Sequence, residues 1–338
     1  MKFLVTGGAG FVGSHLVDKL LQLGHEVTTL DDLSNGKYNY IQSAMKHPNH
    51  DFVCGTIMDA DLIDQLVSNH DGVFHLAAVL GVKNCVESPR KTIENNVLGT
   101  RNILESCFHR NKRVVFASTS EVYGKNSKVP FREDSDRVLG ATMIHRWSYA
   151  TAKALDEHLC LAYTKEGLQS VILRYFNIYG PRSEGTPYAG VIPIFIRAAL
   201  ENRPLTVYGD GRQTRCFTYV DDCVACTIAA MESGTNGMVF NVGTTDEISI
   251  MDLAHRIKRM TGSASEIVLI PYKEAYGEGY EDMQRRLPDL SRTTEVLKYT
   301  NMTPLDEGLR KTIRWHLEEM GLHDEGDSPI FGAKQHAT

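Results

Sequence analysis

Short apolar runs alternate with longer amphipathic stretches through the first half of the chain. The runs are KFLVT (2–6), EVTTLD (26–31), GVFHLA (72–77), RVVFAS (113–118) and SVILRYFNIYG (170–180). The amphipathic stretches are FVGSHLVDKLLQLG (11–24), TIENNVLGTRNILESCFHR (92–110) and WSYATAKALDEHLCLAYTKE (147–166). This alternation predicts an α/β fold, in which a doubly wound parallel sheet carries helices on both faces. Folds of this kind bind ligands at the carboxyl ends of their strands.

The pattern changes after about residue 180. Gly, Pro and Arg become frequent in GPRSEGTPYAG and ENRPLTVYGDGRQTR, which predicts loops that cover a ligand. We therefore assign residues 1–180 to the sheet domain, with a return to it around 216–245. Residues 181–322 are assigned mainly to a smaller C-terminal α/β subdomain that binds substrate. Residues 323–338 are expected to be a mobile tail.

A glycine-rich turn connects the first predicted strand to the first predicted helix. Gly7, Gly10 and Gly13 stand there in LVTGGAGFVGSHL, a context typical of a Rossmann-type dinucleotide site. The glycines let the backbone approach a pyrophosphate, and the helix N-terminus supplies amide donors. Asp31 ends the second strand and is placed to bind the adenosine ribose. It favours NAD over NADP, because a 2′-phosphate would meet a carboxylate. Asp32 is the alternative for this contact.

The composition narrows the range of partners and compartments. The chain has 338 residues, of which 42% are hydrophobic and 23% charged, and a net charge of −6, so no nucleic acid partner is expected. No apolar stretch approaches about 20 residues, so no membrane span is expected, and no signal peptide is visible. Seven cysteines without a pattern favour a reduced, cytoplasmic setting. The pair Cys223 and Cys226 has no evident metal or redox partner, so we predict that it packs and that the chain has no metal site.

Tyr149 and Lys153 form a Y-x-x-x-K pair on one face of a predicted helix. A phenol is a poor base at its ordinary pKa of about 10. An ammonium one turn away, and the positive nicotinamide ring of NAD+, would favour the phenolate. A strand-end hydroxyl such as Thr119 is placed to hold a substrate oxygen beside it. After a dinucleotide turn, this set favours catalysis over a surface tyrosine and lysine.

These residues belong to a series of motifs that resembles the extended short-chain dehydrogenase/reductase superfamily, the nucleotide-sugar epimerases, dehydratases and decarboxylases. The motifs are TGGAGFVGSHL, FHLAA, NNVLGT, STSEVYG, YATAK, RYFNIYGPR, LTVYGDGRQTRCFTYVDD and NVG, within about residues 1–320. The resemblance implies that Thr119, Tyr149 and Lys153 are the catalytic set. It also implies a UDP-sugar or similar nucleotide-sugar substrate and a tightly bound NAD that is recycled in each turnover.

The same resemblance extends the cofactor site and implies an assembly. The additional cofactor-binding residues are Phe11, Val12, Ala77 and Asn96, with Tyr149 and Lys153. One position departs from the family: the third strand often ends GDI, with an Asp on adenine, and here it reads GTI. We expect Thr56 to make a weaker or rearranged adenine contact. A homodimer is implied, through a bundle of the helices at about 92–108 and 148–165.

The segment after Thr119 indicates the sugar chemistry. Related dehydratases read Thr-Asp-Glu there, and their Asp protonates a leaving hydroxyl. This chain has Thr119, Ser120 and Glu121, which weighs against 4,6-dehydration and resembles the UDP-glucuronate decarboxylases. Those enzymes also carry an Arg before a Pro-Asp, matched by Arg286 in MQRRLPDL. Arg146 in HRWSYATAK matches an Arg that precedes the tyrosine in the related aminoarabinose enzyme.

Decarboxylation gives these residues a chemical purpose. Oxidation of C4 in a uronic acid places a ketone β to the C6 carboxylate, and a β-keto acid loses CO2 readily. Arg286 would position that carboxylate, and Glu121 would orient the ring or manage a proton through Ser120 or a water. The alternatives are a solvated carboxylate for Glu121, and for Arg286 a surface ion pair or a phosphate contact, with Arg285 beside it as a substitute.

Two other functions stay open. The loop TPYAGVIPIFI looks more like that of nucleotide-sugar 4-epimerases, so the sugar carries an extra group such as N-acetyl, or the enzyme epimerises C4 without losing carbon. A non-catalytic NAD-binding sensor is the remote alternative, since such proteins tend to lose the tyrosine or the lysine. The predicted substrate contacts in the second half are Arg182 and Arg215 for the diphosphate, Asn177 beside them and Tyr208 for the base.

Overall fold

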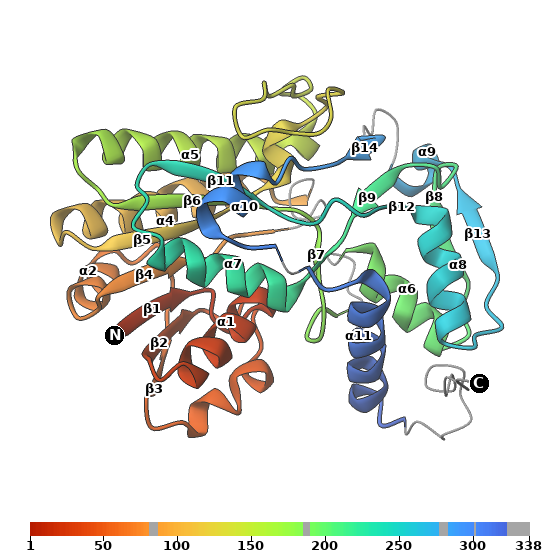
Figure 1. Ribbon diagram of the computed structural model, residues 1–338, viewed down its shortest axis with the longest axis horizontal. Helices are drawn as coiled ribbons and strands as arrows, with labels where there is room; N and C mark the ends of the chain where they lie inside the picture. Colours follow the sequence, from red (N-terminus) through yellow and green to blue (C-terminus); the bar gives the residue numbers. More distant parts are fainter. Residues whose placement is uncertain (81–86, 185–189, 277–282, 301, 323–338) are drawn as a thin grey trace.

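A seven-stranded parallel sheet forms the centre of the larger part of the molecule (Figure 1). The computed structural model describes residues 1–80, 87–184, 190–276, 283–300 and 302–322. The strands, in their order across the sheet, are β11 (Met238–Val242), β6 (Ser170–Tyr175), β5 (Arg113–Thr119), β4 (Gly72–His75), β1 (Lys2–Thr6), β2 (Glu26–Asp31) and β3 (His50–Cys54). The order reverses between β1 and β4, and ligands bind at such switch points.

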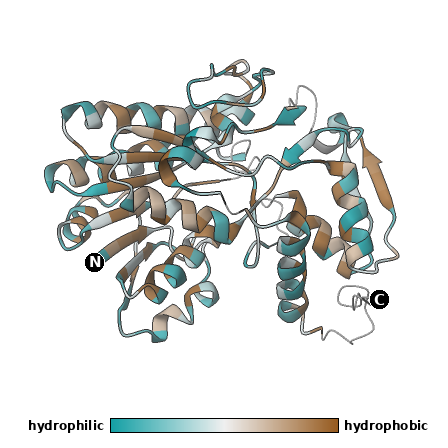
Figure 2. Cartoon of the chain, viewed as in Figure 1, coloured by the Kyte–Doolittle hydropathy of each residue, from teal (hydrophilic) through white to brown (hydrophobic). Residues whose placement is uncertain are grey.

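Helices cover both faces of this sheet. They are α1 (Phe11–Gln22), α2 (Ala60–Ser68), α4 (Pro89–His109), α5 (Ser148–Glu166) and α7 (Val220–Glu232). On one face α1 packs against α7, and on the other α4 lies between α2 and α5. In Figure 2 the hydrophobic residues of the central strands lie between helices whose outer faces are largely hydrophilic. The predicted doubly wound parallel sheet is confirmed.

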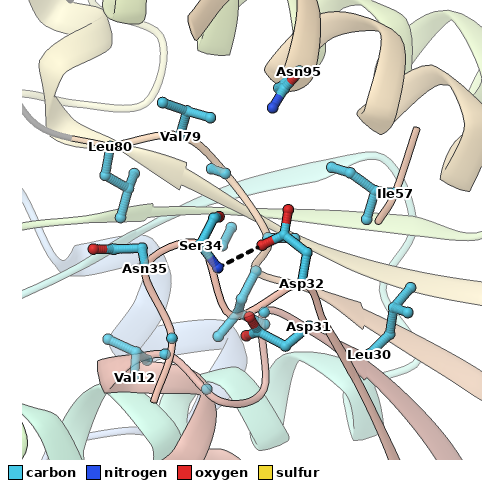
Figure 3. A pocket seen from close by; sticks show the side chains of 18 of the residues that line it. Val12, Leu30, Asp31, Asp32, Ser34, Asn35, Ile57, Val79, Leu80 and Asn95 are labelled. Carbon is cyan, nitrogen blue, oxygen red and sulfur yellow. Dashed lines mark hydrogen bonds between the residues drawn. The ribbon is translucent and has the colours of Figure 1, made fainter. Parts of the chain in front are cut away.

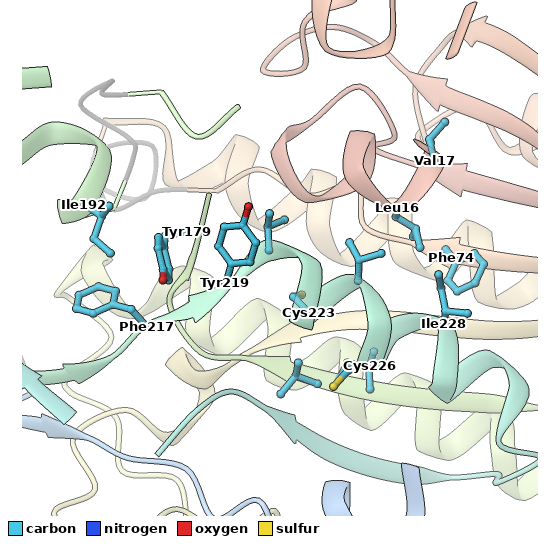
Figure 4. Close-up of a cluster of buried hydrophobic side chains, with 14 of the residues drawn as sticks. Leu16, Val17, Phe74, Tyr179, Ile192, Phe217, Tyr219, Cys223, Cys226 and Ile228 are labelled. Atoms are coloured by element: carbon cyan, nitrogen blue, oxygen red, sulfur yellow. The ribbon is translucent and has the colours of Figure 1, made fainter. Parts of the chain in front are cut away.

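The packing on the α1–α7 face also explains the C-x-x-C pair. Cys223 and Cys226 on α7 are fully buried in an apolar cluster that includes Leu16 and Val17 of α1 (Figure 4). Burial raises the pKa of both thiols, which opposes thiolate formation. Both are free, as are the other cysteines of the described residues. The prediction that the pair packs in the core is therefore confirmed.

Smaller elements form the second part of the molecule, on the right in Figure 1. Its helices are α6 (Val191–Leu200), α8 (Ile250–Met260), α9 (Tyr272–Tyr276) and α11 (Leu305–Glu319), whereas α10 (Ser291–Leu297) lies against β11 and α7 of the sheet domain. The strands are β7 (Ile178–Tyr179), β8 (Leu205–Tyr208), β9 (Thr214–Cys216), β10 (Thr218–Tyr219), β12 (Glu247–Ser249), β13 (Ile267–Ile270) and β14 (Arg285–Arg286). They pair as β10-β7, β12-β9-β14 and β13-β8.

Two sequence predictions are modified or extended by these elements. The run 170–180 is not one strand: β6 ends at Tyr175, and β7 follows Asn177, whose φ of 41° turns the chain out of the sheet. Later, β11 pairs with β6, so residues 238–242 lie in the large sheet. The domain boundaries remain a prediction, and the tail predicted for 323–338 lies outside the described residues. Within the described ranges, no helix has the length and apolar character needed to cross a membrane.

Candidate active site

The glycine turn lies between β1 and α1, at the carboxyl edge of the sheet. Gly7 has a φ of 71°, and its amide donates to the carbonyl of Leu30 at 2.8 Å. A Cβ on Gly13 would overlap the carbonyl oxygen of Gly7, so only glycine keeps this turn closed. Gly10 has no side chain with which to cap α1. The first amides of α1 therefore remain available to an anion such as a pyrophosphate.

A pocket opens along this turn and continues across the strand ends (Figure 3). The residues predicted for the cofactor that line it are Gly7, Gly10, Phe11, Val12, Gly13, Asp31, Thr56, Ala77 and Tyr149. Asp32, Ile57, Val79 and Asn95 also line it. A cradle that a single Cβ would fill, an open helix N-terminus and the buried carboxylate of Asp31 at the end of the second strand together fit a bound dinucleotide.

Asp31 and Asp32 both reach this pocket but differ in their contacts. Asp31 is buried and accepts hydrogen bonds from the amides of Ala9 at 3.0 Å and Leu33 at 2.9 Å. Burial raises the pKa of the Asp31 carboxyl, and those two amides partly oppose the rise. Asp32 accepts from the amide of Ser34 at 2.9 Å (Figure 3). Asp31 thus fixes the turn and still presents lone pairs to a ribose.

Asn96 does not line the pocket. Its side chain donates to the carbonyl of Val79 at 3.1 Å and accepts from the amide of Val79 at 2.8 Å. It therefore fixes the backbone of a pocket wall from behind, and its neighbour Asn95 faces the pocket instead. The motif NNVLGT contains both residues, but the side of α4 that faces the pocket depends on how the helix packs.

The predicted catalytic pair, Tyr149 and Lys153, lies on the first turns of α5. Tyr149 lines the pocket, whereas Lys153 is buried and does not line it. The Lys153 Nζ lies 3.9 Å from the ring centroid of Phe116 and 3.9 Å from Oδ2 of Asp156. Burial lowers the pKa of Lys153, and Asp156 is the main opposing influence. Thr119 ends β5, and its hydroxyl accepts from the amide of Glu121 at 3.2 Å.

Three charged residues from distant segments meet beyond the end of β5. Glu121 follows the strand in the short helix η3 (Ser120–Tyr123), Arg146 lies in η4 (His145–Trp147) and Arg286 ends β14. The Glu121 carboxylate lies 2.7 Å from an Nη of Arg286 through one oxygen and 2.7 Å from an Nη of Arg146 through the other. We call these three residues the charged triad.

The charged triad is buried. The side chains of Glu121, Arg146 and Arg286 are 17%, 6% and 7% exposed, so neither a solvated carboxylate nor a surface ion pair describes them. Burial alone would raise the pKa of Glu121, but the two guanidinium groups hold it well below its usual range. Arg286 also approaches the Ser120 hydroxyl and the Asn177 side-chain oxygen, each at 3.4 Å. Glu121 is therefore an anion that positions two cations, which favours an orienting role over the handling of protons.

The other predicted substrate residues are not all brought together. Arg215 on β9 is paired in register with Arg286 on β14, and Asn177 donates to the carbonyl of Cys216 at 2.9 Å. Tyr208 ends β8 and is partly exposed. Arg182 instead forms an ion pair of 2.6 Å with Asp18 on α1. Arg182, which we predicted to bind the diphosphate, is thus already paired with Asp18. This contact connects the loop after β7 to α1.

The fold, the glycine turn and the tyrosine–lysine pair define a dinucleotide-dependent enzyme of the Rossmann type. A profile of the NAD-dependent epimerase/dehydratase family matches residues 3–243. The chain therefore belongs to this family, which confirms the predicted superfamily and NAD as the cofactor. Among the described residues, no group of three or more His, Cys, Asp or Glu side chains is arranged to hold a metal ion.

Relatives with assigned activities are similar along almost the whole chain. The chain is 49% identical over 315 residues to UDP-N-acetyl-alpha-D-glucosaminuronate decarboxylase of Bacillus cytotoxicus, covering 93% of this chain and 97% of that protein. It is 37% identical to UDP-glucuronic acid decarboxylase 1 of Xenopus tropicalis, covering 94% and 73%. A solved UDP-glucuronic acid 4-epimerase of Bacillus cereus, in complex with UDP-glucuronic acid and NAD, is 31% identical with a TM-score of 0.84, covering 95% and 100%.

Proposed function

We propose that this protein decarboxylates a UDP-linked uronic acid through a 4-keto intermediate, with NAD reduced and reoxidised in the same turnover. The observation that carries the proposal is the buried charged triad at the end of β5. Support also comes from the two relatives named as decarboxylases of UDP-uronic acids.

The charge of the triad favours an acidic sugar. Two guanidinium groups and one carboxylate leave a formal charge of +1 on these three side chains, which are largely withdrawn from water. An unbalanced buried charge is costly, and a carboxylate from the substrate would neutralise it. Arg286 and Arg146 are already oriented by Glu121, so little side-chain entropy is lost when they bind that carboxylate. A neutral hexose would leave the charge uncompensated.

The residues of the chain then divide the chemistry between them. NAD, when bound, supplies the acceptor and later the donor of the C4 hydride. Tyr149 takes the proton of the C4 hydroxyl, and the Lys153 ammonium favours the phenolate that does so. With the substrate carboxylate held by the triad, the C5–C6 bond breaks and CO2 leaves. The electron pair of the broken bond forms an enolate with the C4 ketone. A proton from water is added at C5 in place of CO2, and Tyr149 returns its proton to the C4 oxygen when the hydride comes back.

The group at C2 of the sugar distinguishes the two candidate uronic acids. The similarity to the Bacillus cytotoxicus enzyme favours the N-acetylated uronic acid over UDP-glucuronate. The alternative function is C4 epimerisation, supported by solved 4-epimerases of similar fold, including one from Thermotoga maritima with 33% identity and a TM-score of 0.86 over 95% of this chain and 100% of that chain. Epimerisation needs the keto sugar to rotate, whereas decarboxylation needs its acidic end to be held.

Mass spectrometry of the products distinguishes these functions. Purified protein with NAD would be incubated with UDP-N-acetylglucosaminuronate, UDP-glucuronate, UDP-N-acetylglucosamine and UDP-glucose in parallel. Decarboxylation predicts a product lighter by CO2 from one or both acidic sugars and none from the neutral sugars. Unchanged mass with a new NMR spectrum would establish an epimerase and overturn the proposal. No product from any sugar, with NAD bound, would favour the sensor alternative.

The assembly and the nucleotide contacts complete the proposal. We propose a cytoplasmic homodimer that packs α4 and α5 of two copies together. The exposed apolar side chains Ile93 and Leu98 on α4 and Leu155 on α5 support this surface. Light scattering of Leu155→Glu against the parent protein would test it, since the variant should be monomeric.

Arg215 remains our candidate for the diphosphate contact, and Tyr208 for the contact with the base.

A further inference from the structure

Asp156 is a buried carboxylate on the same helix as Tyr149 and Lys153. Asp156 follows Lys153 by three residues on α5, and neither side chain reaches the solvent. Its Oδ2 lies 3.9 Å from the Lys153 Nζ, too far for a hydrogen bond but close enough for strong electrostatic coupling. Among the described residues, no hydrogen bond of ordinary geometry reaches either carboxylate oxygen of Asp156.

Glu157, the next carboxylate along α5, is already paired with an arginine. Glu157 forms two hydrogen bonds with Arg174 of β6, at 3.0 and 2.7 Å, and accepts a third from Ser118 of β5. Its charge is therefore compensated by a group other than Lys153. Asp156 is left as the carboxylate whose described ionic partner is the lysine.

The remaining groups around Asp156 are uncharged. From α5 itself comes the Cys160 thiol, whose pKa is raised well above its ordinary value by burial. From α4 comes the Thr100 hydroxyl, which interacts favourably with the Asp156 anion. Phe116 of β5 lies under the Lys153 Nζ. From β4 comes His75, whose pKa is lowered to about 3 by burial and by Lys153, so its imidazole is neutral.

Two of these groups, His75 and Thr100, belong to a chain of hydrogen bonds that leads toward Asp156. The amide of Ala77, in the wall of the dinucleotide pocket, donates to the Thr6 hydroxyl at 3.3 Å. The Thr6 hydroxyl lies 2.7 Å from Nδ1 of His75, and Nε2 of His75 lies 3.1 Å from the Thr100 hydroxyl. With the proton of His75 on Nε2, every donor in the chain points the same way, and the Thr100 hydroxyl proton is left for Asp156. The chain thus favours a negative charge at its end.

We propose that Asp156 is a positioning residue that keeps the Lys153 ammonium charged and in place beside Tyr149. The proposal rests on the tyrosine–lysine step of the proposed function and not on what later happens to the sugar carboxylate. A fully buried lysine over an aromatic ring loses its hydration, so a nearby anion is needed to hold its proton at alkaline pH. At 3.9 Å the ammonium hydrogens are not committed to a hydrogen bond with Asp156.

The ionisation of the pair gives the sign of the expected effect. Burial raises the pKa of Asp156 to about 7, and Lys153 opposes the rise. Burial lowers the pKa of Lys153, and Asp156 is the first group that opposes the fall. Replacing Asp156 by a neutral residue removes that opposition, so Lys153 loses its proton at lower pH. Tyr149 then loses the cation that favours its phenolate.

The test is Asp156→Asn, which keeps the shape and removes the charge. The alkaline limb of the profile of kcat against pH should move down by about one unit or more, the shift expected of one charge at this distance, while KM changes little. The tyrosinate absorbance that depends on Tyr149, measured without substrate as the difference from a matching Tyr149→Phe protein, should reach its full value at higher pH. This second readout needs no turnover, so it distinguishes failure of this proposal from failure of the proposed function.

Three further variants keep the result interpretable. Thr100→Val, which removes only the hydroxyl at the end of the chain, should shift the alkaline limb in the same direction by less. Asp156→Glu should restore most of the parental profile. Asp222→Asn removes another buried carboxylate, one bound by Tyr299 and Thr303 away from α5, and should leave the profile in place. An Asp156→Asn profile and tyrosinate titration that coincide with those of the parent would overturn the proposal, as would a uniform loss of kcat at every pH.

Discussion

The two ends of the candidate active site are built from different materials. The dinucleotide end consists mainly of glycines, backbone amides and small apolar side chains, with Asp31 as its buried acid. The end that we propose for the sugar consists of the charged triad, Glu121, Arg146 and Arg286, contributed by three separate segments. A shared cofactor can be bound through backbone shape, whereas a particular acidic sugar must be distinguished by charge. Changes at the two ends should therefore have separable effects.

The largest effect is expected where the two ends meet. Tyr149→Phe keeps the ring that lines the pocket and removes the phenol that exchanges the proton. Hydride transfer should fall by about 10³-fold or more, toward the upper range for a positioned acid–base group, and NAD should still bind. Single-turnover NADH absorbance with a UDP-uronic acid measures this. Tyr163→Phe, on the same helix but packed against Phe108, is the matched control and should be unaffected. Equal rates in Tyr149→Phe and the parent would refute the tyrosine mechanism.

A change at the sugar end should slow decarboxylation and leave NAD binding intact. Arg286→Ala leaves Glu121 with Arg146 alone and removes the positive charge proposed for the substrate carboxylate. We expect CO2 release to slow by about 10²-fold, as on loss of one positioned group, with NAD affinity unchanged. Release of CO2 and formation of NADH would be followed in the same reaction.

The adjacent arginine provides a control for this prediction. Arg285 is about half exposed and pairs with Glu247 at the surface, a contact of little energetic value. Arg285→Ala should therefore release CO2 at nearly the parental rate. If Arg285→Ala were the slower of the two variants, the assignment of the carboxylate site to the triad would be wrong.

NAD binding at the dinucleotide end should weaken when a substitution disturbs the backbone of the glycine turn. Gly13→Ala places a methyl group against the carbonyl oxygen of Gly7, which cannot move without opening the turn. Overpacking of this kind costs about 1–3 kcal/mol, so the Kd for NAD should rise by roughly 10- to 100-fold. Gly190→Ala, where a Cβ meets no neighbour among the described residues, controls for the loss of a glycine as such. Calorimetric titration with NAD would decide, and equal Kd values for both variants would contradict the prediction.

The sequence predicted these two ends unequally. The glycine turn and Asp31 could be found because strand, turn, helix and acid follow one another within residues 2–31. Glu121 and Arg286 were assigned to one end of the sugar by resemblance, but they are 165 residues apart, and their bridge by Arg146 depends on the packing of η4. Asn96 was predicted in place of Asn95 because adjacent helical residues share a motif but not a face. The pairing of Arg182 with Asp18, across 164 residues, left no local signal.

The smallest effect comes from acid, and it should separate the two ends in one protein. Burial raises the pKa of Asp31 above its ordinary value, whereas the two arginines hold that of Glu121 well below its own against the effect of burial. As the pH falls toward the range in which carboxyl groups titrate, Asp31 therefore takes up a proton before Glu121 does and loses acceptor capacity for the ribose. Because the native state binds that proton more tightly than the unfolded chain does, this protonation does not itself unfold the protein. The ionised Glu121 contributes stability above its ordinary pKa, and that contribution is lost only as the pH falls through its lowered native value.

NAD affinity should thus fall by up to about tenfold at acid pH, as on loss of one charged hydrogen bond, while circular dichroism stays native and the triad stays charged. Asp31→Asn should bind NAD weakly at every pH, with a flat profile, whereas Asp32→Asn should keep the parental slope. A parental slope in Asp31→Asn, and a flat profile in Asp32→Asn, would transfer the ribose contact to Asp32.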